Sequence, residues 1–276
     1  MSEDGSNPGL PKVPPGATAP FADAQLYDAE YRNYKRDAGF YRRTAEDLLG
    51  GPAEVLELAC GTGRVTRELV RSGHHGVGFD YSAAMLRRAR SRLDRLPRDA
   101  GSRAHLFQGD MRQFALKRRF PLIICAFNSF EHLYSRDEIA SCLACVKQHL
   151  ALDGVFLFDV HHPEPRVLGY PTTKVWGKRT FRDESGRWLR RSLRSSYDRQ
   201  RQIHNVAARY QPLADDKQTP DGASFEFHLR QRQFFPVELD LLLEEAGFDV
   251  ALRLGDFENH EFSATSPNQV MFCRPA

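Results

Sequence analysis

The chain has 276 residues, 41% of them hydrophobic and 27% charged, which is an ordinary globular composition and excludes a fibrous or wholly disordered protein. Its 39 basic and 36 acidic residues leave a formal net charge of +3 at pH 7, which is too small to favour a nucleic-acid partner. No apolar run reaches the roughly eighteen residues of a membrane span, and the first residues lack a basic and apolar leader, so we expect no membrane partner.

Residues 1–20 are rich in proline and glycine and nearly lack large apolar side chains, so burial cannot offset the entropy of ordering them. We expect a disordered tail. Between residues 22 and 49, aromatic residues recur at the three-and-four spacing of helices. This segment is expected to form two short helices that lie over the rest of the protein.

Short apolar strands alternate with helices between residues 54 and 160. The expected strands are 54–59, 76–80, 105–107, 122–127 and 154–160, and the expected helices are 64–71, 82–96 (with Ser82 as N-cap) and 136–150. Strands that alternate with helices at these spacings need crossover connections, which make neighbouring strands parallel. We therefore predict an α/β fold with a mostly parallel sheet covered on both faces.

The alternation stops between residues 165 and 235. Four segments separated by turn-forming clusters indicate an inserted antiparallel β meander: 173–182, 188–197, 203–210 and 224–234. A helix at 236–246 and strands at 248–254 and 269–273 close the chain. The predicted organisation is a tail (1–20), a main domain (21–163 and 235–276) and an inserted lid, substrate or dimerisation subdomain (164–234).

The five cysteines are an odd number, and three of them lie beside or within apolar runs. Buried, reduced thiols in a cytoplasmic protein account for this pattern. Cys142 and Cys145 form a CxxC pair on an expected helix, but no second pair and no histidine pair follows at zinc spacing. We therefore expect no metal site.

A glycine-rich turn, Gly61-Thr62-Gly63, lies between an expected strand and an expected helix. In this arrangement, backbone N–H groups and the helix terminus meet a ligand at the carboxyl edge of the sheet. Glu57 stands four residues before Gly61, where a carboxylate would repel a phosphate and attract an ammonium or sulfonium group. Asp80 closes the second strand, the position from which an acidic residue accepts hydrogen bonds from a ribose diol.

Four short motifs, each at the end of an expected strand, occur in a recognisable order. They are residues 57–64 (ELACGTGR), 78–82 (GFDYS), 108–112 (QGDMR) and 127–130 (FNSF). This series resembles that of class I, Rossmann-like S-adenosylmethionine-dependent methyltransferases of the small-molecule N-/O-methyltransferase type. The resemblance implies a seven-stranded sheet of strand order 3-2-1-4-5-7-6 with an antiparallel last strand.

The resemblance also implies that the cofactor is S-adenosylmethionine and suggests its contacts. Asp80 would bind the ribose hydroxyls and Asp110 the adenine amino group, while an electron-rich ring, Tyr27 or Tyr34, would cap the sulfonium. The full set of expected cofactor contacts is Tyr27, Tyr34, Glu57, Ala59, Gly61, Gly63, Asp80, Tyr81, Met85, Asp110, Met111, Phe127 and Asn128. For the methionine carboxylate the sequence leaves the choice between Arg42 and Arg43 open.

Two histidines are the candidate catalytic residues. Transfer of an activated methyl group needs mainly alignment, and an amine must lose its proton whereas a hydroxyl needs a base in the transition state. His132 follows the fourth strand, where the resemblance places a residue that faces the acceptor. His161 and His162 follow the fifth strand, where alternation predicts that only one of them, taken as His161, faces the pocket. Glu131 is a weaker candidate.

The inserted segment contains many arginines, and we expect most of them to form a solvated surface. A functional alternative is that one or two of these arginines bind a carboxylate or phosphate of the acceptor through bidentate hydrogen bonds.

The sequence therefore predicts a methyltransferase that acts on a nitrogen or oxygen of a small molecule, which would be anionic if the arginines bind it. Similarity to glycine and amino-sugar N-methyltransferases favours nitrogen. A homodimer through the inserted strands is a further expectation. One alternative is an RNA or protein methyltransferase that docks through the arginines, although Asn128 lacks the Pro-Pro-aromatic sequence of many base-methylating enzymes. A second alternative is a binding module that holds the cofactor without catalysis.

Overall fold

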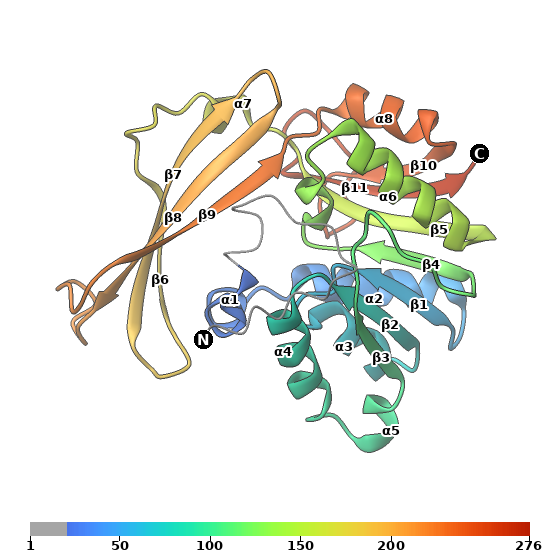
Figure 1. Ribbon diagram of the computed structural model, residues 1–276, viewed down its shortest axis with the longest axis horizontal. Coiled ribbons are helices and arrows are strands. Elements are labelled where there is room, and N and C mark those ends of the chain that lie inside the picture. Colours follow the sequence, from blue (N-terminus) through green and yellow to red (C-terminus); the bar gives the residue numbers. More distant parts are fainter. Residues whose placement is uncertain (1–20) are drawn as a thin grey trace, which may run out of the picture.

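The computed structural model describes residues 21–276, so the disordered tail expected at residues 1–20 lies outside the described residues. The described chain forms a seven-stranded sheet with helices on both faces and a four-stranded antiparallel sheet beside it (Figure 1). Within residues 21–276, no helix is long and apolar enough to cross a lipid bilayer.

The larger sheet has the order β10-β11-β5-β4-β1-β2-β3. Its strands are β1 (Glu54–Leu58), β2 (His75–Asp80), β3 (Ala104–Gln108), β4 (Phe120–Cys125), β5 (Leu150–His161), β10 (Phe248–Leu254) and β11 (Asn268–Pro275). The first five strands pair in parallel, and β11 pairs antiparallel with both β5 and β10. Counted within this sheet alone, the order is 3-2-1-4-5-7-6, which confirms the predicted fold class.

Six helices of the described chain cover this sheet, and side-chain caps begin two of them. The six helices are α2 (Arg36–Leu49), α3 (Arg64–Arg71), α4 (Ala83–Leu93), α5 (Arg98–Gly101), α6 (Arg136–His149) and α8 (Pro236–Glu245). Ser82 accepts a hydrogen bond from the Met85 N–H and caps α4, as predicted. Ser135 and Glu138 form a reciprocal capping box at the start of α6.

Two apolar cores lie on opposite faces of the larger sheet, because successive side chains of a strand point to opposite sides. In β4, Leu122 and Ile124 join the core beneath α2 and α3, whereas Ile123 and Cys125 join the core beneath α6 and α8. The second core contains several aromatic rings in contact, and Phe156 stacks on Phe158 with 4.8 Å between ring centroids. Because helices cover both faces of this sheet, a ligand can reach it only at an edge.

The inserted segment forms its own sheet, of order β6-β7-β8-β9, as predicted. Its strands are β6 (Trp176–Arg182), β7 (Trp188–Asp198), β8 (Ile203–Leu213) and β9 (Phe225–Arg232), and they follow the short helix α7 (Pro165–Leu168). All three strand pairs are antiparallel. In Figure 1 this sheet stands beside the carboxyl edge of the larger sheet.

Helix α1 (Ala24–Tyr31) lies between the two sheets and is held to both by buried carboxylates (Figure 1). Asp28 accepts hydrogen bonds from Arg88 and Arg92 of α4, both at 2.6 Å, and from the Thr62 hydroxyl at 2.7 Å. Glu30 accepts a hydrogen bond from the Tyr210 hydroxyl of β8 at 2.6 Å. These contacts fix the tyrosines of α1 at the junction of the two sheets.

Candidate active site

Two adjoining cavities open where the parallel strands end. The smaller one, of about 140 Å³, lies over the ends of β1, β2 and β3. The larger one, of about 880 Å³, lies between the end of β5, helix α1 and the inner face of the inserted sheet. Among residues 21–276, four line both cavities: Phe21, Tyr27, Phe127 and His132. A ligand in one cavity would therefore meet a ligand in the other at these side chains.

The glycine turn after β1 needs left-handed backbone angles. Gly61 has φ of +56° and Gly63 has φ of +71°, a region that side chains with a Cβ rarely adopt. A Cβ on Gly63 would lie 3.1 Å from the Cβ of Ala89 in α4, so this glycine lets α3 and α4 approach closely. A Cβ on Gly61 would meet nothing within 4 Å, and Gly61 lines the smaller cavity.

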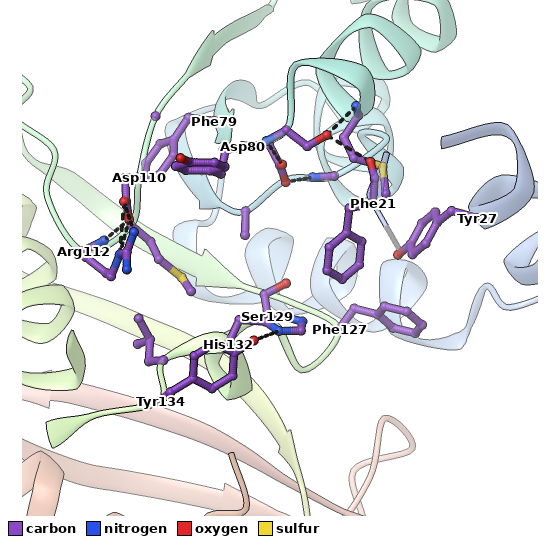
Figure 2. A pocket seen from close by; sticks show the side chains of 18 residues that line it. Phe21, Tyr27, Phe79, Asp80, Asp110, Arg112, Phe127, Ser129, His132 and Tyr134 are labelled. Atoms are coloured by element: carbon purple, nitrogen blue, oxygen red, sulfur yellow. Dashed lines mark hydrogen bonds and ion pairs between the residues drawn. The ribbon is translucent and has the colours of Figure 1, made fainter. Parts of the chain in front are cut away.

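Asp80 holds the glycine turn and lines the same cavity. One of its carboxylate oxygens accepts the Gly61 N–H and the other accepts the Ser82 N–H, both at 2.8 Å. Burial raises the pKa of Asp80 to about 6, and the two N–H donors oppose this rise. Each carboxylate oxygen has a second lone-pair direction, so Asp80 can still accept two hydroxyl donors from a ligand. In Figure 2, Asp80 lies across the cavity from His132.

Apolar side chains and a buried ion pair form the wall on the β3 side. Met85 and Met111, two of the expected cofactor contacts, line the smaller cavity together with Ala59, Tyr81 and Phe79. Asp110 also lines it, but Arg112 donates to both of its carboxylate oxygens, the shortest contact being 2.6 Å. The sequence analysis missed Arg112, although it stands only two residues after Asp110.

Glu57 and Gly63 are not among the described residues that line either cavity. The carboxylate of Glu57 accepts a hydrogen bond from the Thr66 hydroxyl of α3, and burial raises the pKa of Glu57 to about 7. This placement joins β1 to α3, and it gives no support to the expectation that Glu57 repels phosphate from the cavity.

Tyrosines surround the ring of Phe127. Tyr27, Tyr31 and Tyr34 place their ring centroids 6.2, 5.0 and 5.3 Å from that of Phe127. Tyr27 lines both cavities, whereas Tyr34 lines only the larger one. Burial raises the pKa of Tyr27 to about 12, so this phenol stays neutral at physiological pH.

The cation beside these rings is Arg64, which the sequence analysis did not single out. Its guanidinium lies 4.6 Å from the centroid of Phe127 and donates to both oxygens of Asp37, at 2.9 and 2.6 Å. Arg42, one of the two expected cations, instead pairs with Glu46 on its own helix at 2.7 Å. The sequence did contain one signal for Arg64, because this residue directly follows the glycine turn at the edge of the expected cofactor site.

Asp159 holds the turn that follows β4. Phe127 and Asn128 have φ of +59° and +58°, an unfavourable conformation for residues with side chains. Their N–H groups donate to the two oxygens of Asp159, at 2.7 and 2.9 Å, and the Tyr41 hydroxyl also donates to this carboxylate. Oδ1 of Asn128 is buried and has no hydrogen-bond partner among residues 21–276. A donor on a ligand would satisfy it.

The candidate histidines occupy different places. His132 ends the 3₁₀ helix η2 (Ser129–His132) and lines both cavities, with its Nδ1 3.3 Å from the Tyr134 hydroxyl (Figure 2). Burial lowers the pKa of His132. His161 and His162 both line the larger cavity, so the expectation that only one would do so is wrong. Strand β5 ends at His161, and strand alternation does not apply beyond it.

Two arginines of the inserted sheet line the larger cavity, namely Arg179 and Arg191. They are direct neighbours across β6 and β7. Arg191 is paired with Glu30 at 2.5 Å, whereas Arg179 makes no hydrogen bond or ion pair within the described part of the chain.

Comparisons with known proteins agree with this architecture. Residues 55–154 match a methyltransferase domain family. A dTDP-3-amino-3,6-dideoxy-alpha-D-glucopyranose N,N-dimethyltransferase from Streptomyces fradiae is 35% identical over 155 residues, which are 53% of this chain and 56% of that protein. The match thus spans about half the length of this relative, and a second curated sugar N,N-dimethyltransferase is likewise covered over 56% of its length.

Solved structures are similar over nearly the whole chain. A methyltransferase from Streptomyces caelestis, CcbJ, superposes with a TM-score of 0.70 at 25% identity, covering 90% of this chain and 96% of its own. An S-adenosylmethionine-dependent methyltransferase from Clostridium acetobutylicum gives 0.72 at 19% identity, covering 92% of this chain and 97% of its own. These matches confirm the resemblance that the four motifs indicated.

Replacement of Asp159 by asparagine tests whether its carboxylate maintains the turn after β4. An asparagine has one acceptor oxygen for the two N–H groups and turns an NH₂ toward the other, so we expect a loss of about 1–3 kcal/mol in the free energy of unfolding. The control Tyr41→Phe removes only the hydroxyl donor and should cost about 1 kcal/mol. Urea denaturation measures both, and a free energy of unfolding of Asp159→Asn equal to that of the wild type would contradict this role of Asp159.

Proposed function

We propose that this protein is an S-adenosylmethionine-dependent methyltransferase that methylates a nitrogen of a small, anionic molecule. The nucleoside part of the cofactor would occupy the smaller cavity, and the acceptor the larger one. The observation that carries the proposal is the meeting of the two cavities at Tyr27, Phe127 and His132. That junction is where a methyl group would have to pass from donor to acceptor.

The residues of the smaller cavity fit this cofactor. Asp80 has free lone pairs for two ribose hydroxyls, and Met85 and Met111 offer apolar contact for a purine. The tyrosine rings and Phe127 offer electron-rich surfaces to a sulfonium. When bound, the cofactor supplies an activated methyl group, which the acceptor's lone pair takes up while the bonding pair of the carbon–sulfur bond remains on sulfur.

Nitrogen is the better-supported acceptor atom. The relatives from Streptomyces are named as N,N-dimethyltransferases of dTDP-linked amino sugars. The junction offers an acceptor for an N–H group of an amine, because His132 lines both cavities, has a lowered pKa and is neutral at physiological pH. An amine needs only to lose a proton before it attacks.

The larger cavity favours an acceptor with negative charge. Arg179 and Arg191 face each other across two strands, and only one carboxylate, Glu30, pairs with them in the described structure. Like charges opposite each other in a sheet are unfavourable, so an anionic group on the ligand would balance the second guanidinium charge. A phosphate or a carboxylate would meet this need.

The other expectations from the sequence stay predictions. A homodimer through the inserted sheet, a cytoplasmic location and the division of the chain at residues 164 and 234 are among them. Docking of RNA or a protein is the weaker alternative, because the formal net charge of the chain is only +3. A measurement of turnover distinguishes the proposal from the non-catalytic alternative, which predicts cofactor binding without a methylated product.

Turnover with a panel of acceptors tests the proposed reaction. The purified protein with S-adenosylmethionine should release S-adenosylhomocysteine when it is given amino-sugar phosphates or nucleotides, and much less when it is given the matching hydroxy sugars. Mass spectrometry of the acceptor identifies the methylated atom. Cofactor binding without product from any acceptor would support the non-catalytic alternative, and methylation of bulk RNA would support the docking one.

Replacement of Asp80 by alanine should weaken binding of S-adenosylmethionine about tenfold to a hundredfold, since two hydrogen bonds to a charged group are lost. Isothermal titration calorimetry measures the affinity. The control Asp94→Ala removes an exposed carboxylate just after α4 and should bind as the wild type does. Unchanged affinity in Asp80→Ala would remove the ribose assignment.

Replacement of Arg179 by alanine should raise KM for a phosphorylated acceptor about tenfold or more and leave its kcat and the cofactor affinity nearly unchanged, because a charge-assisted hydrogen bond is lost. The control Arg182→Ala removes an exposed arginine of the same strand. The same KM in all three proteins would mean that the acceptor's anion lies elsewhere.

A further inference from the structure

A buried carboxylate lies behind one histidine of the larger cavity. Glu131 is in the 3₁₀ helix η2 and has 1% of its side chain exposed. One of its oxygens accepts the backbone N–H of His161 at 2.7 Å and lies 2.9 Å from Nδ1 of the same residue. Its other oxygen accepts the side-chain amide of Gln231 in β9 at 2.8 Å. Glu131 thus joins η2, the end of β5 and the inserted sheet.

This contact fixes both the orientation and the tautomer of His161. An ionised carboxylate can only accept hydrogen bonds, so Nδ1 of His161 carries the proton and Nε2 carries the lone pair. The His161 side chain is 47% exposed and lines the larger cavity, so its ring is accessible to an acceptor.

The other histidines of the cavity lack such a partner. Nδ1 of His132 faces the Tyr134 hydroxyl, and Nδ1 of His162 lies 2.9 Å from the carbonyl oxygen of Ser266. His204 stacks on Trp176, and its Nε2 has no hydrogen-bond partner within residues 21–276.

The charges around His161 favour its protonated form. The carboxylates of Glu131, from η2, and of Asp159, from its own strand, act in this direction. His204 of β8 also faces His161, and its pKa is lowered to about 4, so it is uncharged at neutral pH. Partial desolvation in the cavity lowers the pKa of His161, but the carboxylate of Glu131 and the charge of Asp159 outweigh this effect, and the pKa is raised. Burial lowers the pKa of His132 and lowers that of His204 to about 4. His161 therefore holds a proton more readily than either.

We propose that Glu131 is a positioning residue that directs Nε2 of His161 toward the acceptor and makes His161 the group that takes the acceptor's proton. The inference rests on the proposed function. In this step, an N–H bond of the acceptor breaks, its electron pair stays on nitrogen, and the proton forms a new bond to Nε2. His161 becomes an imidazolium beside the ionised Glu131, and its exposed ring later releases the proton to solvent.

The first test measures the pKa of His161 without any acceptor, so it does not depend on activity. Titration of the histidine ring C–H signals by ¹H–¹³C NMR gives the values, and His161→Gln identifies the signal by its loss. In Glu131→Gln the pKa of His161 should fall by about one unit, because the negative charge is removed. The hydrogen bonds can persist in this variant, since the Gln231 amide can turn over to present its oxygen.

A matched control is available on the surface. Asp256 and His260 form a second carboxylate–histidine pair, with 2.7 Å between Oδ2 and Nδ1, and Asp256 raises the pKa of His260. Asp256→Asn should lower the pKa of His260 and leave that of His161 at its wild-type value. An unchanged pKa of His161 in Glu131→Gln would overturn the proposal.

The second test is the pH dependence of methyl transfer. Activity that needs neutral His161 is lost as the pH falls through its pKa, so Glu131→Gln should move the acid limb of kcat/KM to lower pH by about one unit. Glu131→Gln and His161→Gln should both lower kcat more than they raise KM. If Glu131→Gln keeps the wild-type kcat and the wild-type position of the acid limb, the proposal is overturned. If the wild-type protein itself releases no S-adenosylhomocysteine, the proposed function is overturned instead.

Discussion

Four backbone N–H groups at the carboxyl edge of the sheet donate to two carboxylates, of which Asp159 is fully buried and Asp80 lines the smaller cavity. Asp80 accepts those of Gly61 and Ser82, and Asp159 accepts those of Phe127 and Asn128. Three of these four donors, Gly61, Phe127 and Asn128, have left-handed backbone. Glycine adopts it freely, whereas for the two residues with side chains the hydrogen bonds to Asp159 can offset the unfavourable conformation. The walls of both cavities depend on these two turns, because one carries the glycine edge of the smaller cavity and the other carries the ring shared by both.

The site is completed by a helix that belongs to neither sheet. Helix α1 is anchored through Asp28 to α4 and through Glu30 to the inserted sheet. Because both anchors are largely buried charge pairs, removal of one partner would leave an uncompensated charge, and the position of α1 is strongly specified. This placement brings Tyr27 to the boundary between the cavities, so a substrate in the larger cavity is enclosed by three separate parts of the chain.

The surroundings of the histidines give identical side chains different protonation behaviour. His132 is enclosed by aromatic rings and stays neutral, whereas His161 has a buried carboxylate behind it. A neutral imidazole can accept a hydrogen bond at the junction, and a carboxylate-backed imidazole can hold a full proton. The proposed mechanism therefore assigns the two histidines to different steps of the same transfer.

The strand order of the sheet followed only from the resemblance of four motifs to a known family. The order of helices and strands and the place of Asp80 at the end of its strand were predictable from the sequence, because periodicity, caps and turn residues act over a few neighbouring positions. The partners of the buried charges were not. Asp37 pairs with Arg64 across 27 residues, Tyr41 reaches Asp159 across 118, and Glu57 turns to Thr66 instead of the cavity. A carboxylate in a sequence has many possible donors, and only the packing of distant segments into one interior decides which of them it meets.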